Sequence, residues 1–138
     1  MTQVTNRRAF IKAGAATASA LAMPAFAQGK PNAIRMGFIG VGNRGSQLLH
    51  IFMDQPDVEV VALCDVYGPY MRRDDAAVSP RWRTLLGDRI PQMGEKFPKP
   101  VTYYTDYRDL LANKEIDAVC IATPDHWHAI QTIEAIQA

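Results

Sequence analysis

Apolar runs alternate with amphipathic stretches from residue 33 to the end of the chain. Four runs have the length and flanking residues of buried strands: residues 34–39, 58–63, 101–104 and 117–122. Helical spacing of apolar side chains predicts helices between and after them: residues 43–55, a short helix that Asp106 caps, and residues 129–138. Strands that alternate with helices favour an α/β fold. We therefore predict a Rossmann-like parallel sheet of about four strands, incomplete, with helices on both faces.

The stretch between the second and third strands is less regular. Its four prolines predict broken helical pieces and a surface loop: Pro80, Pro91, Pro98 and Pro100. The same stretch holds a basic cluster, consisting of Arg72, Arg73, Arg81 and Arg83. Runs of charge are usually solvated, so we expect a solvated face here rather than a phosphate contact.

The first 27 residues have the order of a twin-arginine export signal. Arg7 and Arg8 precede a weakly apolar stretch, residues 13–22, and small residues at Ala25 and Ala27 suit a signal peptidase. The alternative is an amphipathic helix with incidental arginines. The apolar stretch is shorter than the ~20 residues that a membrane span needs, so we expect no stable span. The pattern predicts a signal peptide at 1–27, a linker at 28–32, the export machinery as a partner, and a periplasmic or other extracytoplasmic location.

The bulk composition excludes some classes of function. The chain has 138 residues, of which 48% are apolar and 21% charged, and a formal net charge of +1. This composition is globular, and no overall positive field attracts nucleic acid. Cys64 and Cys120 fall in the second and fourth strands, which the common Rossmann order separates by about 9–10 Å, too far for a disulfide. We expect two buried free thiols.

A glycine motif links the first strand to the first helix. Gly40, Gly42 and Gly45 form the pattern GxGxxG directly after the strand. In this context Gly40 permits a tight turn, Gly42 lets a pyrophosphate approach, and Gly45 lets helix and strand pack closely. The helix N-terminus then offers unpaired N–H groups to the phosphates. The alternative is a structural turn without a ligand.

Asp65 ends the second strand, 20 residues beyond Gly45. An acidic residue at this place accepts hydrogen bonds from the adenosine ribose, and it repels a 2′-phosphate, which favours NAD over NADP. A solvated acid at a strand end is the alternative. Arg72 and Arg73 keep NADP possible, because a nearby arginine can accommodate the extra phosphate.

Residues 123–128 follow the fourth strand, where α/β sheets bind ligands. Asp125, His126 and His128 could ligate a metal, but a zinc site usually needs three or four protein ligands and no further cluster exists in the sequence. We therefore predict no metal. Asp125 could instead cap the last helix.

Four motifs in this order resemble the Gfo/Idh/MocA family, named after glucose–fructose oxidoreductase, inositol dehydrogenase and a rhizopine-catabolism protein. They span residues 34–45, 62–66, 104–111 and 122–129. The resemblance covers residues 33–138 and implies an NAD(P)-binding domain of a two-domain oxidoreductase with sugar-like substrates. It places Gly40, Gly42, Asn43, Arg44 and Gly45 at the pyrophosphate and Asp65 at the adenosine ribose. It places Thr123, Pro124 and Asp125 at the nicotinamide side, where His128 matches a histidine often found in this loop.

Two departures limit the resemblance. Residues 74–94 form a longer segment than the family usually has there. The family's Glu-Lys-Pro motif and its substrate domain would follow Ala138, so we expect an N-terminal part with no catalytic residue of its own. We expect this part alone to be catalytically silent and to associate, and the full-length protein to be a homo-oligomer.

Three functions remain open, the first two for a full-length protein and the third for the fragment alone. The first is hydride transfer between a sugar-like alcohol and NAD(P). The second is a hydrolase or isomerase that uses NAD without net redox change. The third is a non-catalytic dinucleotide-binding or ligand-sensing fragment.

Overall fold

The computed structural model describes residues 33–138, which form one compact unit. The predicted signal peptide and linker lie outside the described residues. In the part that the structure describes, no helix is long and apolar enough to cross a membrane.

The core is a parallel sheet of four strands. The strands are β1 (Ile34–Ile39), β2 (Val58–Cys64), β3 (Thr102–Tyr104) and β4 (Ala118–Ile121). They lie in the order β3-β2-β1-β4, and every neighbouring pair is parallel. The predicted Rossmann-like sheet is confirmed. Because β1 separates β2 from β4, Cys64 and Cys120 do not meet and both are free thiols, with Cys64 buried and Cys120 half-buried.

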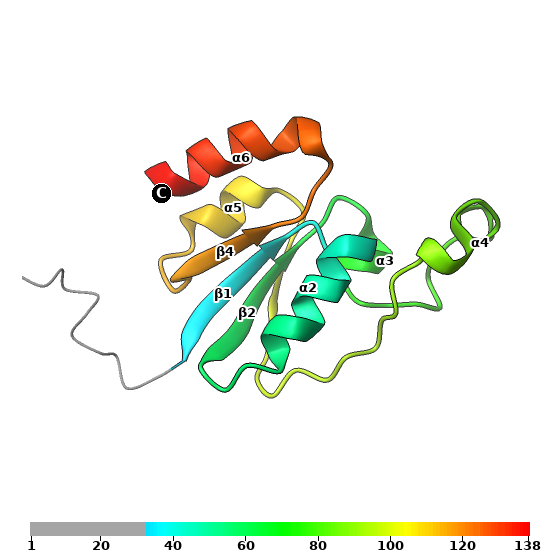
Figure 1. Cartoon of the computed structure of the whole chain (residues 1–138), viewed down its shortest axis with the longest axis horizontal. Coiled ribbons are helices and arrows are strands. Elements are labelled where there is room, and N and C mark those ends of the chain that lie inside the picture. Colours follow the sequence, from blue (N-terminus) through cyan, green and yellow to red (C-terminus); the bar gives the residue numbers. More distant parts are fainter. Residues whose placement is uncertain (1–32) are drawn as a thin grey trace, which may run out of the picture. The chain divides into compact units, whose positions relative to one another are not determined.

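Helices cover both faces of the sheet (Figure 1). They are α2 (Asn43–Met53), α3 (Gly68–Met71), α4 (Pro80–Leu86), the 3₁₀ turn η3 (Gly87–Arg89), α5 (Tyr107–Ala112) and α6 (Asp125–Gln137). Successive strand residues point to opposite faces. Phe38 packs under α2, where its ring meets Phe52 edge-on at 5.8 Å between centroids. Ile39 packs on the other face with Leu110 of α5.

The stretch between β2 and β3 contains the short pieces that its prolines predict. Pro80 begins α4, and the hydroxyl of Ser79 caps that helix by accepting from the N–H of Trp82. No residue of α4 is buried. Figure 1 shows α4 projecting from the sheet and its covering helices.

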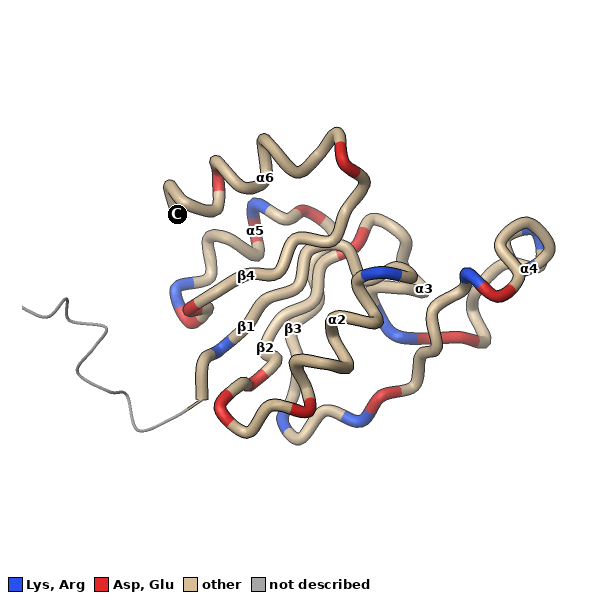
Figure 2. The backbone as a smooth tube through the Cα atoms, viewed as in Figure 1, with Lys and Arg blue, Asp and Glu red and all other residues tan. Residues whose placement is uncertain are grey.

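Two expectations about this fold are wrong. The last helix begins at Asp125 and not at Ala129, because Pro124 supplies the N-cap position and its carbonyl accepts from the N–H of Trp127 at 2.9 Å. Asp125 is therefore not the cap but the first helical residue, where an acidic side chain favours the helix dipole. The arginine cluster is not one solvated face, since the side chain of Arg73 is only 3% exposed. Along the rest of the described chain, basic and acidic positions are interspersed (Figure 2).

The sheet ends at β4, and α6 has little sheet to cover. The helix buries Gln131, whereas Ile133 is 55% and Ile136 81% exposed. The strand itself carries no charge or proline at Val119, Cys120 or Ile121, the residue types that usually protect an edge. The helix α6 that carries these isoleucines packs beside β4 at one edge of the sheet (Figure 1).

We predict that the 138-residue chain self-associates through this end of the sheet. Replacing Ile133 and Ile136 together by lysine should shift sedimentation toward the monomer without lowering thermal stability, because both side chains are already exposed. Ile51→Lys is the control, since Ile51 has the same 55% exposure on α2. Association that persists in the double variant, or that the control also abolishes, would contradict the prediction.

Candidate dinucleotide-binding site

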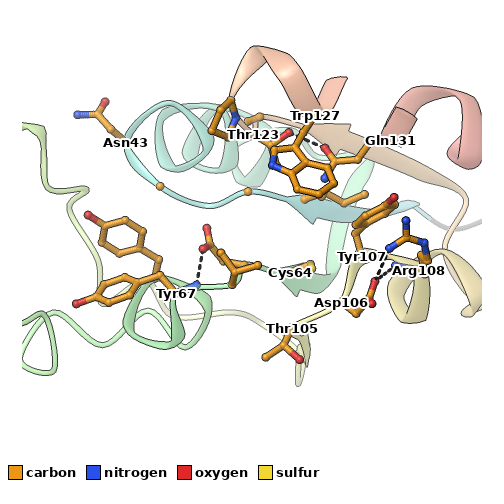
Figure 3. A pocket seen from close by; sticks show the side chains of 18 residues that line it. Asn43, Cys64, Tyr67, Thr105, Asp106, Tyr107, Arg108, Thr123, Trp127 and Gln131 are labelled. Atoms are coloured by element: carbon orange, nitrogen blue, oxygen red, sulfur yellow. Dashed lines mark hydrogen bonds and ion pairs between the residues drawn. The ribbon is translucent and has the colours of Figure 1, made fainter. Parts of the chain in front are cut away.

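A cavity of about 640 Å³ opens at the carboxyl ends of the strands (Figure 3). Its size is that of typical small-molecule sites. Six of the residues predicted from the sequence line it: Gly40, Gly42, Asn43, Asp65, Thr123 and Pro124. The cavity lies where a doubly wound α/β sheet is expected to bind a ligand.

Gly40 and Gly45 are required by the fold itself. Gly40 has a φ of +83°, and a Cβ there would lie 2.9 Å from the backbone of Ala122 and of Thr123. A Cβ on Gly45 would lie 2.0 Å from the carbonyl oxygen of Gly40. The turn after β1 therefore packs closely against both α2 and the end of β4. Gly45 is buried and lies outside the cavity lining.

Gly42 is not required by the fold. Its φ is −69°, which any residue adopts, and a Cβ would meet only the ring of Tyr70 at an ordinary 3.6 Å. The glycine instead keeps its side of the cavity free at the start of α2. No side chain caps that helix, so its first N–H groups have no side-chain partner. A pyrophosphate could therefore approach the backbone at Gly42 and accept hydrogen bonds from the uncapped N–H groups of α2.

Asp65 holds the glycine loop as well as facing the cavity. Its Oδ2 accepts from the N–H of Val41 and its Oδ1 from the N–H of Tyr67, both at 2.9 Å. A carboxylate has about four lone-pair sites. Each oxygen therefore retains acceptor capacity for a ribose hydroxyl.

The side chains of Asn43 and Arg44 make protein contacts. Asn43 donates from Nδ2 to the carbonyl of Arg89 at 2.8 Å, which ties the start of α2 to η3. Arg44 is exposed, donates to Gln47 at 3.0 Å and lies outside the cavity lining.

Thr123 is fixed from α6. Its Oγ1 donates to Oε1 of the buried Gln131 at 2.5 Å, and its carbonyl accepts from Nε2 of His128 at 2.6 Å. His128 therefore faces the backbone of Thr123, and neither it nor Asp125 lines the cavity. Across residues 33–138, no group of three or more His, Cys, Asp or Glu side chains is placed to hold a metal ion.

Aromatic and polar side chains that the sequence analysis did not single out complete the walls. They are Tyr67, Tyr70, Tyr107, Arg108, Trp127 and Gln131. The rings of Tyr67 and Tyr70 meet edge-on at 4.8 Å, and the guanidinium of Arg108 lies 4.5 Å from the ring centre of Tyr107. Tyr67, Tyr107 and Arg108 come within a few residues of a strand end, and that position is a signal that sequence reasoning could have used, because strand ends face the cavity.

The Cys64 thiol and the Tyr107 hydroxyl on the cavity lining are held in their protonated forms. Burial raises the pKa of the Cys64 thiol to about 12, so it remains a thiol. Burial and the nearby Glu134 carboxylate raise the pKa of the Tyr107 hydroxyl. Neither group supplies a base or nucleophile near neutral pH.

The family comparison agrees with this geometry. The family model of the Gfo/Idh/MocA oxidoreductases, described as an oxidoreductase family with an NAD-binding Rossmann fold, matches residues 34–138. The chain belongs to this family. Its NAD-binding Rossmann fold accordingly holds the candidate site.

Curated relatives of the Gfo/Idh/MocA chain carry glycosidase names. A glycosyl hydrolase family 109 protein of Stenotrophomonas maltophilia is 38% identical, with 96% of this chain and 28% of that protein covered. An alpha-N-acetylgalactosaminidase of Shewanella oneidensis is 35% identical, with 79% of this chain and 21% of that protein covered. The chain thus spans about a quarter of the length of these relatives.

Solved structures of similar fold carry dehydrogenase or reductase names. Scyllo-inositol dehydrogenase of Lactobacillus casei, with bound NAD(H) and scyllo-inositol, has a TM-score of 0.52 at 20% identity over 77% of this chain and 26% of its own. A 3-ketoreductase of Actinomadura kijaniata, in complex with NADP, has a TM-score of 0.54 at 21% identity over 77% of this chain and 27% of its own. These likenesses show the Rossmann fold.

We predict that Gly42→Ala separates ligand binding from folding. The added methyl meets no clash, so stability should change by no more than about 1 kcal/mol, the usual scale of a residue change at a helix N-cap. NAD affinity, measured by calorimetric titration of the 138-residue chain, should fall about tenfold or more because the pyrophosphate loses its close approach.

Gly87→Ala is the converse control. Its φ of +48° strains any side chain, so alanine should lower stability there, but the residue lies outside the cavity with nothing within 4 Å of the new Cβ. NAD affinity should be unchanged in this variant. Equal affinity in Gly42→Ala and the parent chain would refute the assignment of Gly42 to the pyrophosphate.

Proposed function

We propose that this chain is the dinucleotide-binding N-terminal part of an exported enzyme that transfers hydride between bound NAD and a sugar-like alcohol. The observation that carries the proposal is Gly42, a glycine that neither backbone angle nor packing requires, beside the uncapped start of α2. The cofactor, when bound, supplies the hydride acceptor.

The residues of this chain would bind and orient that cofactor. The start of α2 would hold the pyrophosphate, Asp65 the adenosine ribose, and Thr123 with Pro124 the border of the nicotinamide. Hydrogen bonds with Gln131 and His128 fix the side chain and the carbonyl of Thr123. The nicotinamide would therefore contact a residue whose conformation is already set.

The charges around the ribose position favour NAD over NADP. Asp65 presents a carboxylate that would repel a 2′-phosphate. Arg73 does not counter that repulsion, because its guanidinium is buried and paired with Glu95. Arg72 is exposed and keeps NADP open as a weaker ligand.

The alcohol proton requires a general base during hydride transfer. We place this base in the part of the enzyme beyond this chain, since the curated relatives are more than three times as long as the segment they share with it. That part would also supply most contacts to the sugar.

A second candidate is a glycosidase that uses NAD without net redox change. The glycosidase names of relatives at 35–38% identity favour it. Transient oxidation of a sugar carbon would acidify the neighbouring C–H, and loss of that proton would expel the aglycone as an alcohol. Water would then add to the resulting double bond, and the hydride would return to the sugar carbon. NAD-dependent glycosidases are known exceptions to the two-carboxylate mechanism. A closed cycle also suits a compartment in which free nicotinamide cofactor is scarce.

Product analysis of the full-length enzyme separates the two candidates. Net oxidation of a free sugar panel should build up reduced cofactor in proportion to product. The closed cycle should instead release an aglycone from a glycoside at catalytic NAD, with no build-up of reduced cofactor, and should exchange hydrogen with D₂O beside the transiently oxidised carbon. Turnover that is indifferent to removal of NAD would overturn both.

Export rests on the leader pattern. The alignment with the Stenotrophomonas protein covers 96% of the chain and so extends into the first 32 residues. Replacing Arg7 and Arg8 by lysine should retain the protein in the cytoplasm with its leader uncleaved, as fractionation and mass spectrometry would show. Normal export of this double variant would point to the general secretory route.

A further inference from the structure

Arg73 occupies an unusual position for a charged residue. Its side chain is only 3% exposed, and its φ of +56° makes it the one non-glycine residue among 33–138 with a left-handed backbone. Such a conformation costs energy and persists where surrounding contacts impose it. The contacts around Arg73 therefore indicate which part of the structure imposes this conformation.

The guanidinium of Arg73 holds the middle of the glycine loop. Its Nη1 donates to the carbonyl of Val41 at 2.8 Å, and its Nη2 donates to the hydroxyl of Ser46 at 2.8 Å. The Ser46 hydroxyl donates in turn to the same carbonyl at 3.1 Å. Val41 lies between Gly40 and Gly42, so both donors fix the peptide that leads into Gly42.

The other side of the guanidinium is tied to the segment that returns toward β3. Nε donates to Oε2 of Glu95 at 2.9 Å, and Nη2 donates to Oε1 of Glu95 and to the carbonyl of Gln92. His50 also donates to Glu95, at 2.7 Å. Burial opposes ionisation of Glu95, but its hydrogen bonds with Arg73 and His50 outweigh burial and lower its pKa.

We propose that Arg73 is a positioning residue for the dinucleotide-binding loop, held by Glu95 and acting through the Val41 carbonyl. The inference deepens the proposed function and rests on it. Glu95 neutralises the charge of Arg73, so the contribution to pyrophosphate binding is geometric. The segment between β2 and β3 thereby fixes the cofactor loop in place.

The competing view is that the Arg73–Glu95 pair serves stability alone. A buried ion pair is by itself weak support for stability, and loss of one partner leaves an unpaired buried charge. The test must therefore use a readout that general destabilisation does not move. The gain in affinity from adenosine to ADP is such a readout, because it isolates the pyrophosphate contacts.

The experiment measures the Kd of adenosine, ADP and NAD by titration calorimetry on the 138-residue chain. Arg73→Lys keeps the charge but loses the planar fork that reaches Val41, Ser46 and Glu95 together. We expect the ratio of the adenosine Kd to the ADP Kd to shrink about tenfold, and NAD affinity to fall in parallel, with adenosine binding unchanged.

Two further variants keep the test decisive. Ser46→Ala removes the second donor to Val41 with a minimal change in volume. It should also shrink the ratio of the adenosine Kd to the ADP Kd, and it keeps the test available if Arg73→Lys fails to fold. Arg83→Lys is the control, because Arg83 is 42% exposed, pairs with Asp75 and lies outside the cofactor cavity. Its ratio should equal that of the parent chain.

The outcomes distinguish a failure of the positioning role from a failure of the proposed function. A parent chain that binds neither ADP nor NAD refutes the proposed function. A parent chain that binds both, with the ratio unchanged in Arg73→Lys and Ser46→Ala, overturns the positioning role alone. Equal losses for adenosine and ADP would assign Arg73 to stability and overturn the inference as well.

Discussion

Val41, between Gly40 and Gly42, is held at both its N–H and its carbonyl, and the candidate site depends on it. The carboxylate of Asp65 accepts from the N–H of Val41, while Arg73 and Ser46 donate to its carbonyl. Charged hydrogen-bond partners are stronger than neutral ones and fix geometry more tightly. With the loop fixed, the start of α2 faces the cavity, and Gly42 leaves that approach open.

This arrangement brings distant parts of the sequence together at the turn after β1. Asp65 follows β2 and Arg73 follows α3, and both bind the turn after β1. Glu95, which precedes β3, holds Arg73 in place. On the far side, α6 fixes Thr123 through Gln131 and His128. Both borders of the cavity are therefore set by side chains from neighbouring elements.

Much of this could be predicted from sequence, because it depends on local pattern. The apolar runs predicted the strands, and the spacing from Gly45 to Asp65 predicted which residues meet at the carboxyl ends. Burial of Arg73 could not be predicted, because its acidic partner, Glu95, lies 22 residues away across an irregular segment. The start of α6 was misplaced because Pro124 and the polar residues after it obscure the apolar period there. The role of His128 was beyond sequence reasoning, since its partner is a backbone carbonyl.

The same cofactor site would serve either of the two proposed chemistries. Hydride transfer to NAD begins both a net oxidation and a closed glycosidase cycle, and the choice between them would depend on groups outside this chain. The account of this chain therefore centres on how it binds the dinucleotide.

That claim is tested most directly by amide NMR of the 138-residue chain during titration with NAD. The account predicts saturable shifts of the amides of Gly42, Asn43 and Arg44 at the start of α2, together with those of Tyr67 and Thr123 across the cavity. Shifts confined to another part of the fold, such as the segment around Asp75 and Arg83, or no saturable shift at all, would contradict it.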